Sequence, residues 1–246
     1  MSQMSKKTKQ WLAIGIGLLV IFILATGYRF GYRFSNFTIG KVGHVNVVVQ
    51  FEGTGIIVDE KQKINTVSTN QTLTLSPGNH EIIVSKDGYF PWVKDFTLPS
   101  AGNLTLSPIF VLQNPTGEII TEKDPEYWKI KNEVETAVLP TKEKPLVSAD
   151  SVTSIWVENN SVMATVNGEI HTVIQPMAAI KNLQFYKNRT DVLIFSAGDS
   201  VSIIETDTKG TQNFFPIYKG TNPLFLETSS DFIYVLDGSV LMQVVI

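Results

Sequence analysis

The chain has 246 residues, with 20 lysines and arginines, 23 aspartates and glutamates, 43% hydrophobic residues and no cysteine. Residues 1–51 contain six basic residues and no acidic one, so the rest holds 14 basic against 23 acidic residues, a formal charge of −9. That charge repels phosphate backbones and argues against nucleic acid as a partner. Without cysteine there is no disulfide framework, so the fold depends on apolar burial and is typical of a bacterial or archaeal extracytoplasmic protein.

An uncharged apolar run of 18 residues extends from Trp11 to Tyr28, directly after three lysines. At about 1.5 Å of rise per residue, a helix of this length covers roughly the hydrocarbon core of a bilayer. Trp11 and Tyr28 stand at its ends, where aromatic rings prefer the level of the lipid headgroups. We therefore predict a cytoplasmic tail over 1–10, a transmembrane helix over 11–28 and the lipid bilayer as a partner.

The flanking charges predict the orientation of this helix. Basic residues are denser before the run than after it, which favours a cytoplasmic N-terminus and an extracytoplasmic remainder. A cleaved signal peptide is the alternative, because Ala25-Thr26-Gly27 resembles a cleavage site. The run is longer than the usual apolar region of about 7 to 15 residues, and no cysteine follows to accept a lipid, so an uncleaved anchor is favoured. A juxtamembrane linker is expected over 29–42, and a single-pass protein of the cell membrane overall.

Short apolar runs separated by turn residues fill residues 43–112. They lie at 44–49, 56–58, 73–75 and 80–84, and Gly, Pro, Asp and Ser stand between them. Spacing of about ten residues between such runs predicts a small all-β sandwich.

Two motifs in this stretch carry a family resemblance. The first is Phe51-Glu52-Gly53-Thr54 with Asp59 after the next strand, and the second is Leu75-Ser76-Pro77-Gly78-Asn79-His80 followed by Lys86-Asp87-Gly88-Tyr89-Phe90-Pro91. In these residues the chain resembles the PEGA family of extracytoplasmic β-sandwich modules. The resemblance implies a display, adhesion or spacer domain without catalytic residues. Its turns would be built by Glu52, Gly53, Asp59, Pro77, Gly78, Gly88, Tyr89 and Pro91.

Residues 113–149 differ in composition, with four prolines and many charged residues. They predict a linker or a wrapping segment. Tyr127 and Trp128 lie in this polar stretch, and such rings usually bury against something. We expect them to dock on the neighbouring domain of the same chain, with an intermolecular contact as the alternative.

Residues 150–246 contain an internal repeat with a period of 39, marked by Ser161, Ser200 and Ser239. Each copy places a polar pair between two apolar strands, and a period near 40 residues is typical of four-stranded β-propeller blades. A ring needs typically four to eight blades, whereas these residues supply about two and a half. We therefore predict an incomplete propeller.

The run at 241–246 ends the chain as an apolar strand. An exposed strand of this kind invites pairing with another chain. The sequence is expected to be either a truncated form of a longer protein or one whose sheets another copy or partner completes, with self-association through this strand.

The search for reactive groups finds no catalytic, cofactor-binding or metal-binding motif. The histidines His44, His80 and His171 are far apart, and the usual hydrolase and nucleotide-binding patterns are absent. The favoured hypothesis is a mainly β, non-enzymatic binding or scaffold protein of the cell envelope, which displays its domains toward cell-wall polysaccharide, a surface layer or an envelope protein. The alternative is a propeller-type sensor or enzyme whose site lies in a ring completed by missing sequence or by a partner.

Overall fold

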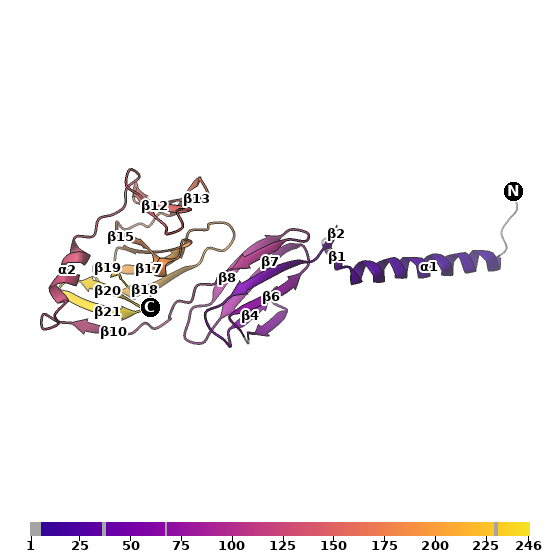
Figure 1. Ribbon diagram of the computed structural model, residues 1–246, viewed down its shortest axis with the longest axis horizontal. Coiled ribbons are helices and arrows are strands. Elements are labelled where there is room, and N and C mark those ends of the chain that lie inside the picture. Colours follow the sequence, from indigo (N-terminus) through magenta and orange to yellow (C-terminus); the bar gives the residue numbers. More distant parts are fainter. Residues whose placement is uncertain (1–5, 36–37, 67, 229–230) are drawn as a thin grey trace. The chain divides into compact units, whose positions relative to one another are not determined.

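The computed structural model describes residues 6–35, 38–66, 68–228 and 231–246. Strands dominate, which confirms the prediction of a mainly β chain behind an N-terminal apolar helix (Figure 1). The chain divides into two compact units. The first runs to Ile82 and includes Asp95–Pro108, and the second comprises Ile83–Lys94 and Ile109–Ile246.

Helix α1 spans Lys6–Arg29 and is longer than the predicted helix at both ends. Residues 1–5 of the predicted cytoplasmic tail lie outside the described residues. The 20 residues Gln10–Arg29 are long and apolar enough to cross a membrane, and none of that segment is buried. Trp11 and Tyr28 both expose their rings. The helix fits either a membrane anchor or a signal sequence.

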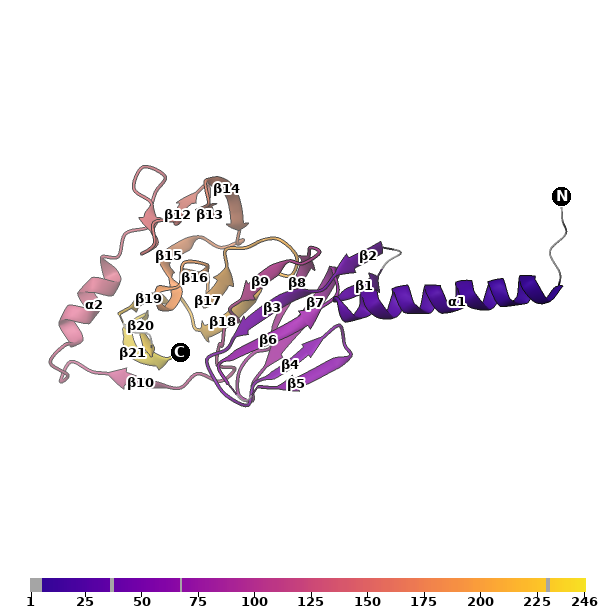
Figure 2. The same ribbon diagram turned by 45° about the vertical axis from the view of Figure 1, so that its right-hand side comes forward.

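The segment expected to be a juxtamembrane linker instead forms a two-stranded antiparallel sheet. Strand β1 (Tyr32–Ser35) pairs with β2 (Thr38–Lys41). The physical reason is composition, because the aromatic residues of β1 and the β-branched residues of β2 favour paired strands over coil. Figure 2 shows this hairpin directly after α1.

The predicted sandwich consists of two sheets with strand orders β6-β3-β9 and β5-β4-β7-β8. Strands β3 and β9 are parallel, whereas β3 and β6 are antiparallel. Strands β3, β4 and β7 each bury alternate residues and so one face, as Val45 and Val47 illustrate. The strands are β3 (Gly43–Val48), β4 (Gly55–Val58), β5 (Gln62–Asn65), β6 (Asn70–Leu75), β7 (Gly78–Ser85), β8 (Trp92–Leu98) and β9 (Asn103–Leu106).

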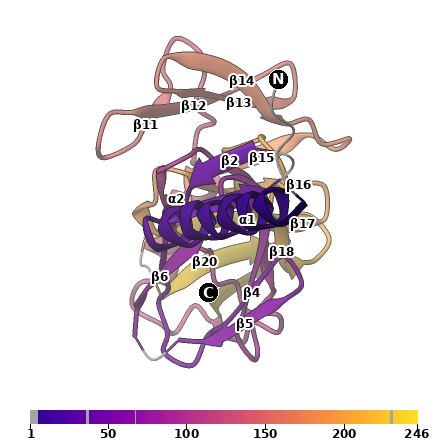
Figure 3. The ribbon, with the colours of Figure 1, turned by 90° about the vertical axis from the view of Figure 1, so that its right-hand side faces the viewer.

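The second unit contains three four-stranded antiparallel sheets. Their strand orders are β11-β12-β13-β14, β15-β16-β17-β18 and β10-β21-β20-β19. Figure 3 shows β12, β13 and β14 of the first of them side by side. The strands are β11 (Leu146–Val147), β12 (Thr153–Glu158), β13 (Ser161–Val166), β14 (Glu169–Ile174), β15 (Ile180–Phe185), β16 (Val192–Ala197), β17 (Ser200–Glu205), β18 (Phe214–Lys219), β19 (Leu224–Glu227), β20 (Phe232–Asp237) and β21 (Val240–Val245).

The 39-residue repeat corresponds to one hairpin in each of these sheets. The three polar pairs join β12 to β13, β16 to β17 and β20 to β21, which are the central strands of their sheets. Across the described residues the sheets are separate and none closes on itself, so a propeller is not established.

Strand β10 (Gly117–Ile120) corrects the prediction for the C-terminal strand. It pairs with β21, Gly117 opposite Val244, and β20 pairs with the other edge of β21. The backbone groups of β21 are therefore satisfied on both sides, and β21 is not the exposed strand expected to mediate self-association. The sequence pattern missed this because the partner lies in the segment assigned as a linker.

That segment, 113–149, also contains α2 (Tyr127–Glu135). Tyr127, Ile130 and Val134 form its buried face and pack against side chains of β20 and β21. Tyr127 thus docks within its own chain, whereas Trp128 leaves 59% of its surface exposed. This helix is therefore anchored on the third sheet through one face.

Candidate functional site

A cleft in the second unit lies where β11, β15 and β19 meet; each precedes the central hairpin of its sheet, and we call these three the first strands. Residues of β11, of β15 and of the end of β19 line one cavity of about 320 Å³. A second cavity of about 380 Å³ shares Leu146 and Gln184 with it, so the two are adjacent. These three strands are edge strands, which leaves their side chains and loops free to shape a cleft.

Amide side chains of β15 hold β19 beside it. The backbone N–H of Phe225 donates to Asn182 Oδ1 (3.2 Å), and that of Glu227 donates to Gln184 Oε1 (2.9 Å). The two amide side chains are two residues apart on β15, and so are the two N–H donors on β19. The amides therefore project from one face of β15 and bind alternate backbone groups of β19. The edge of β19 is therefore covered by side chains rather than by another strand, and Glu227 is fixed at the cleft.

Glu227 is the most perturbed carboxyl group of the cleft. Its Oε1 accepts the backbone N–H of Lys187, whereas its Oε2 is buried with no hydrogen-bond partner among the described residues. Burial raises the pKa of Glu227 to about 7, although the N–H and the charge of Lys187 act in the opposite direction. At neutral pH this carboxyl group therefore exchanges readily between its neutral and charged forms.

Tyr186 shares this environment. It is 1% exposed, and its Oη also has no hydrogen-bond partner within the described part of the chain. Burial raises the pKa of Tyr186 above its ordinary value, and the charge of Glu227 adds to the effect. Burial likewise lowers the pKa of Lys187, and the charges of Glu227 and Asp231 partly offset this lowering.

A strained turn presents the polar rim of the cleft. Lys187 and Asn188 have φ of 50° and 55°, the left-handed region that side chains rarely adopt, although Asn tolerates it. The turn brings Asn188 and Arg189 to the cavity. Arg189 binds Asp191 through Nε (2.9 Å) and Nη2 (2.6 Å), a bidentate pair that orients its guanidinium.

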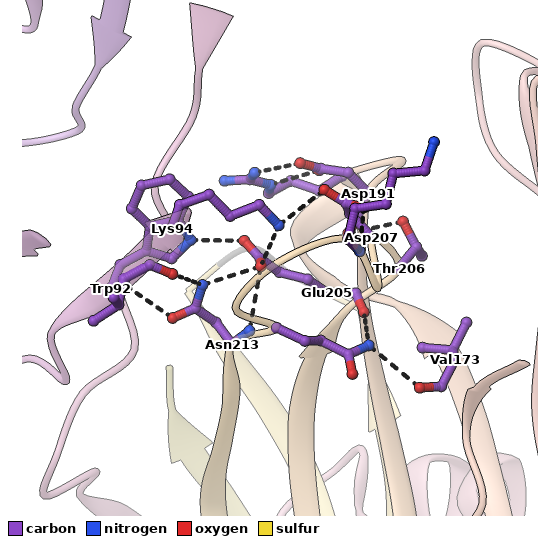
Figure 4. A network of polar contacts seen from close by, with 12 residues as sticks. Trp92, Lys94, Val173, Asp191, Glu205, Thr206, Asp207 and Asn213 are labelled. Carbon is purple, nitrogen blue, oxygen red and sulfur yellow. Dashed lines mark hydrogen bonds and ion pairs between the residues drawn. The ribbon is translucent and has the colours of Figure 1, made fainter. Parts of the chain in front are cut away.

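A buried polar network lies elsewhere in the same unit (Figure 4). Glu205 is its centre: Oε1 accepts Trp92 Nε1 (2.6 Å), and Oε2 accepts Asn213 Nδ2 (3.0 Å) and pairs with Lys94 Nζ (3.4 Å). Lys94 also pairs with Asp207 (2.9 Å). Burial alone would raise the pKa of Asp207, but the N–H of Lys209 and the charge of Lys94 lower it below its usual value.

Asn213 completes the network by forming with its side chain the two backbone hydrogen bonds that a neighbouring strand would form. Its Oδ1 accepts the backbone N–H of Val93 (3.0 Å), and its Nδ2 donates to the carbonyl of the same residue (2.8 Å). The groups of this network satisfy one another, so its role is to fix residues 92–94 within the unit rather than to receive a ligand.

The sequence-predicted turn residues of the sandwich are spread over its loops rather than gathered in a site. Glu52 and Gly53 form the turn after β3, and Gly78 and Gly88 have φ of 136° and 84°, conformations that favour glycine. Pro77 lies in the bend before β7, Tyr89 bridges to Leu112, and Pro91 is exposed before β8. These residues shape turns.

Asp59 has a larger role than a turn residue. Its Oδ1 accepts the N–H of Glu81 (3.1 Å), and its Oδ2 pairs with His80 Nδ1 (2.8 Å), whose Nε2 contacts the carbonyl of Ser76 (2.7 Å). The pair fastens the turn after β4 to β7. Among the described residues, no three His, Asp or Glu side chains gather as metal ligands.

Sequence reasoning did not find the cleft residues. Gln184, Lys187 and Glu227 carry no motif, but their contacts join residues 40 and 43 positions apart, about one repeat period. The repeat was therefore the sequence signal for these contacts, because the first strands of successive sheets become neighbours.

The comparisons with known proteins support the assignment of the sandwich. Residues 42–111 match the family model of the PEGA domain, which confirms the resemblance inferred from the two turn motifs. No curated protein matches the chain.

Proposed function

We propose that this is a membrane-anchored, extracytoplasmic binding protein of the cell envelope that acts without catalysis. The observation that carries the proposal is the order of elements along the chain. An apolar helical segment of 20 residues is followed by a short hairpin and then by a stretch that matches a PEGA domain. A PEGA match fits an extracytoplasmic or surface-associated β domain. The helix then serves as its anchor.

The orientation follows from charge. Three lysines precede the apolar segment, and the residues after it become acidic beyond position 51. The positive-inside rule then keeps the N-terminus in the cytoplasm and the residues after α1 outside.

The cleft supports ligand binding by neutral polar and apolar groups. Gln184 and Asn188 supply amides, Phe185 and Val147 supply apolar surface, and Arg189 is already paired with Asp191. The hydroxyl of Ser148 is committed to Asp150 (2.6 Å). Amides beside apolar surface suit a hydroxyl-rich polymer with apolar ring faces, and cell-wall polysaccharide is the ligand class we propose.

The three sheets of the second unit are part of this proposal as consecutive, propeller-like blades. Support comes from the equivalent central hairpins, the shared strand order and the convergence of the first strands on one cleft. The fourth strand of the third sheet is supplied by β10, so each of the three sheets has four strands.

Glu227 favours one second candidate, a hydrolytic or sensing cleft. A carboxyl group with a pKa near neutral pH in a cavity is a typical general acid. The two candidates differ in one result, because a hydrolase would release soluble sugar from the polymer and a binding protein would not.

The test uses the full chain in detergent micelles and insoluble cell-wall polysaccharide, with bound protein measured by sedimentation. Asn188→Gly keeps the left-handed backbone and removes the amide, so we expect binding to weaken several-fold. Asn159→Gly is the matched control, since Asn159 has the same backbone region (φ 51°) in the β12–β13 hairpin, outside the cleft. Equal binding by both variants would refute the cleft as the binding site.

A separate measurement tests the topology. Protease added to intact spheroplasts should digest the chain beyond about residue 40 and spare the N-terminus. Protection of the second unit would refute the extracytoplasmic placement.

A further inference from the structure

An exposed apolar patch lies at the end of α1 and in the hairpin that follows it. Phe30, Phe34 and Ile39 leave 66%, 70% and 71% of their surfaces exposed, and Tyr28 and Tyr32 are also exposed. We call these five residues the juxtamembrane patch. Exposed aromatic and aliphatic side chains at this density mark an interaction surface.

The register of the hairpin gathers part of the patch on one face. Phe34 stands opposite Ile39, and Tyr32 stands opposite Lys41. Directly paired residues project on the same side, and Tyr32 and Phe34 alternate with Arg33, so these four share a face. That face is apolar near the tip of the hairpin and carries a cation at its base.

The opposite face is fixed to the body of the first unit. Gly40 is buried, and a side chain there would collide with Pro77. The backbone of Lys41 donates to Ser100 Oγ (3.0 Å) and accepts the N–H of Ala101 (3.0 Å). The hairpin is therefore held in place on the domain rather than hanging from a loose tether.

The hairpin is also joined to the end of α1. The Arg33 guanidinium lies 3.7 Å from the centre of the Tyr28 ring, and its Nη1 donates to the carbonyl of Tyr28 (2.9 Å). The N–H of Val42 donates to the carbonyl of Gly31 (2.9 Å), which closes the base of the hairpin beside the helix end. Helix, hairpin and sandwich are thus connected by specific contacts.

We propose that the β1–β2 hairpin lies in the headgroup layer of the bilayer that α1 spans, with Phe34 and Ile39 inserted at the boundary of the hydrocarbon. The inference rests on the proposed membrane anchor. Gln10–Arg29 has 20 residues, so at about 1.5 Å per residue it fills a hydrocarbon core of about 30 Å and brings Phe30 to the headgroups.

Charge supports lipid as the occupant of this face. Lys41 lies on the face, Arg29 and Arg33 lie near it in the sequence, and the first acidic residue of the chain is Glu52. Cations beside aromatic rings suit lipid phosphates above an apolar layer. The hairpin would act as a platform that sets the tilt of the PEGA-type domain on the membrane.

The chain contains no cysteine, so single cysteines can be labelled without background. Phe34→Cys and Ile39→Cys, each carrying an environment-sensitive fluorophore, are placed in the full chain and reconstituted into vesicles of phosphatidylcholine and phosphatidylglycerol. Two controls accompany them: Leu18→Cys within α1, and Glu52→Cys in the exposed turn beyond the far end of β3. Lipids with a spin-label quencher near the headgroup or in mid-chain report the depth of each probe.

We expect shallow quenchers to quench the probes at 34 and 39 several-fold more than the probe at 52, and mid-chain quenchers to act most strongly at 18. Quenching at 34 and 39 no greater than at 52, with 18 quenched, would overturn the hairpin proposal and leave the anchor standing. A blue-shifted but unquenched probe at 39 would show that protein covers the face, and would also overturn it. An unquenched probe at 18 would refute the anchor and this inference together.

Discussion

Replacing Glu227 with glutamine should make the protein more stable above neutral pH than the wild type. The side chain keeps its size and the Oε1 acceptor for the Lys187 N–H, so the change removes only the charge. It resembles the protonated form of the carboxyl group, in which the position of Oε2 is likewise buried without a partner among the described residues.

The sign follows from proton binding. The pKa of Glu227 is raised from 4.5 to about 7, so the folded protein binds this proton more tightly than the unfolded chain. Wild-type stability is therefore highest below pH 4.5 as far as this group is concerned, falls as the pH rises from about 4.5 to about 7, and stays low above it. Glutamine does not ionise and has no such loss.

The magnitude comes from the same pKa values. At about 1.4 kcal/mol per pH unit, the shift corresponds to roughly 3 kcal/mol. The carboxyl group is partly solvated, so screening reduces this to about 1–2 kcal/mol. In a unit of this size that stabilisation raises the midpoint of thermal unfolding by roughly 2–8 °C.

The assay is urea unfolding of the full chain in micelles, followed by tryptophan fluorescence, at pH 4.5 and pH 8. We expect the variant to match the wild type at the lower pH and to exceed it at the higher one. Glu118→Gln, at an exposed position of β10, controls for the general loss of a carboxylate. If the free energy of unfolding differs between Glu227→Gln and wild type by the same amount at both pH values, the reasoning is refuted.

Three further changes test other features of the structure. Tyr186→Phe removes a buried hydroxyl without a partner in the described chain, so stability should stay level or rise by up to about 1 kcal/mol in thermal unfolding, and a clear loss would reveal an unseen partner. Gly78→Val should cost on the order of 1–3 kcal/mol in the free energy of unfolding, because φ is 136° there, and an unchanged melting temperature would contradict that backbone conformation. Glu205→Gln removes one of the two carboxylates paired with buried Lys94 and should cost about 2–4 kcal/mol in urea unfolding at pH 7, whereas a neutral result would mean that Asp207 alone satisfies the ammonium.

The first unit was largely predictable because its information is local. Alternating apolar residues at Val45 and Val47 and the turn at Pro77-Gly78 predict strands and bends within a few residues of themselves. Strands β5, β8 and β9 were not predicted. The defining contact of β9 is a parallel pairing with β3, from which about 60 residues separate it. A pattern read along the chain does not contain that pairing.

The second unit was predictable in its hairpins and not in its cleft. The polar pairs around Ser161, Ser200 and Ser239 identify central turns. The raised pKa of Glu227 depends on burial, which arises only when the first strands of separate sheets meet. Its sequence neighbours are ordinary strand residues, so nothing in the local sequence marks it.

The pairing of β10 with β21 has a consequence for how the second unit forms. Most strands of this unit can pair with the next strand to be synthesised, but β10 must wait for β21, which is the last strand of the described chain. A pairing of such long range carries a large loop-closure entropy and forms slowly. In a chain synthesised N-terminus first, the edge of β10 stays open until β21 has been made, and during that interval the nascent protein is exposed to misassembly.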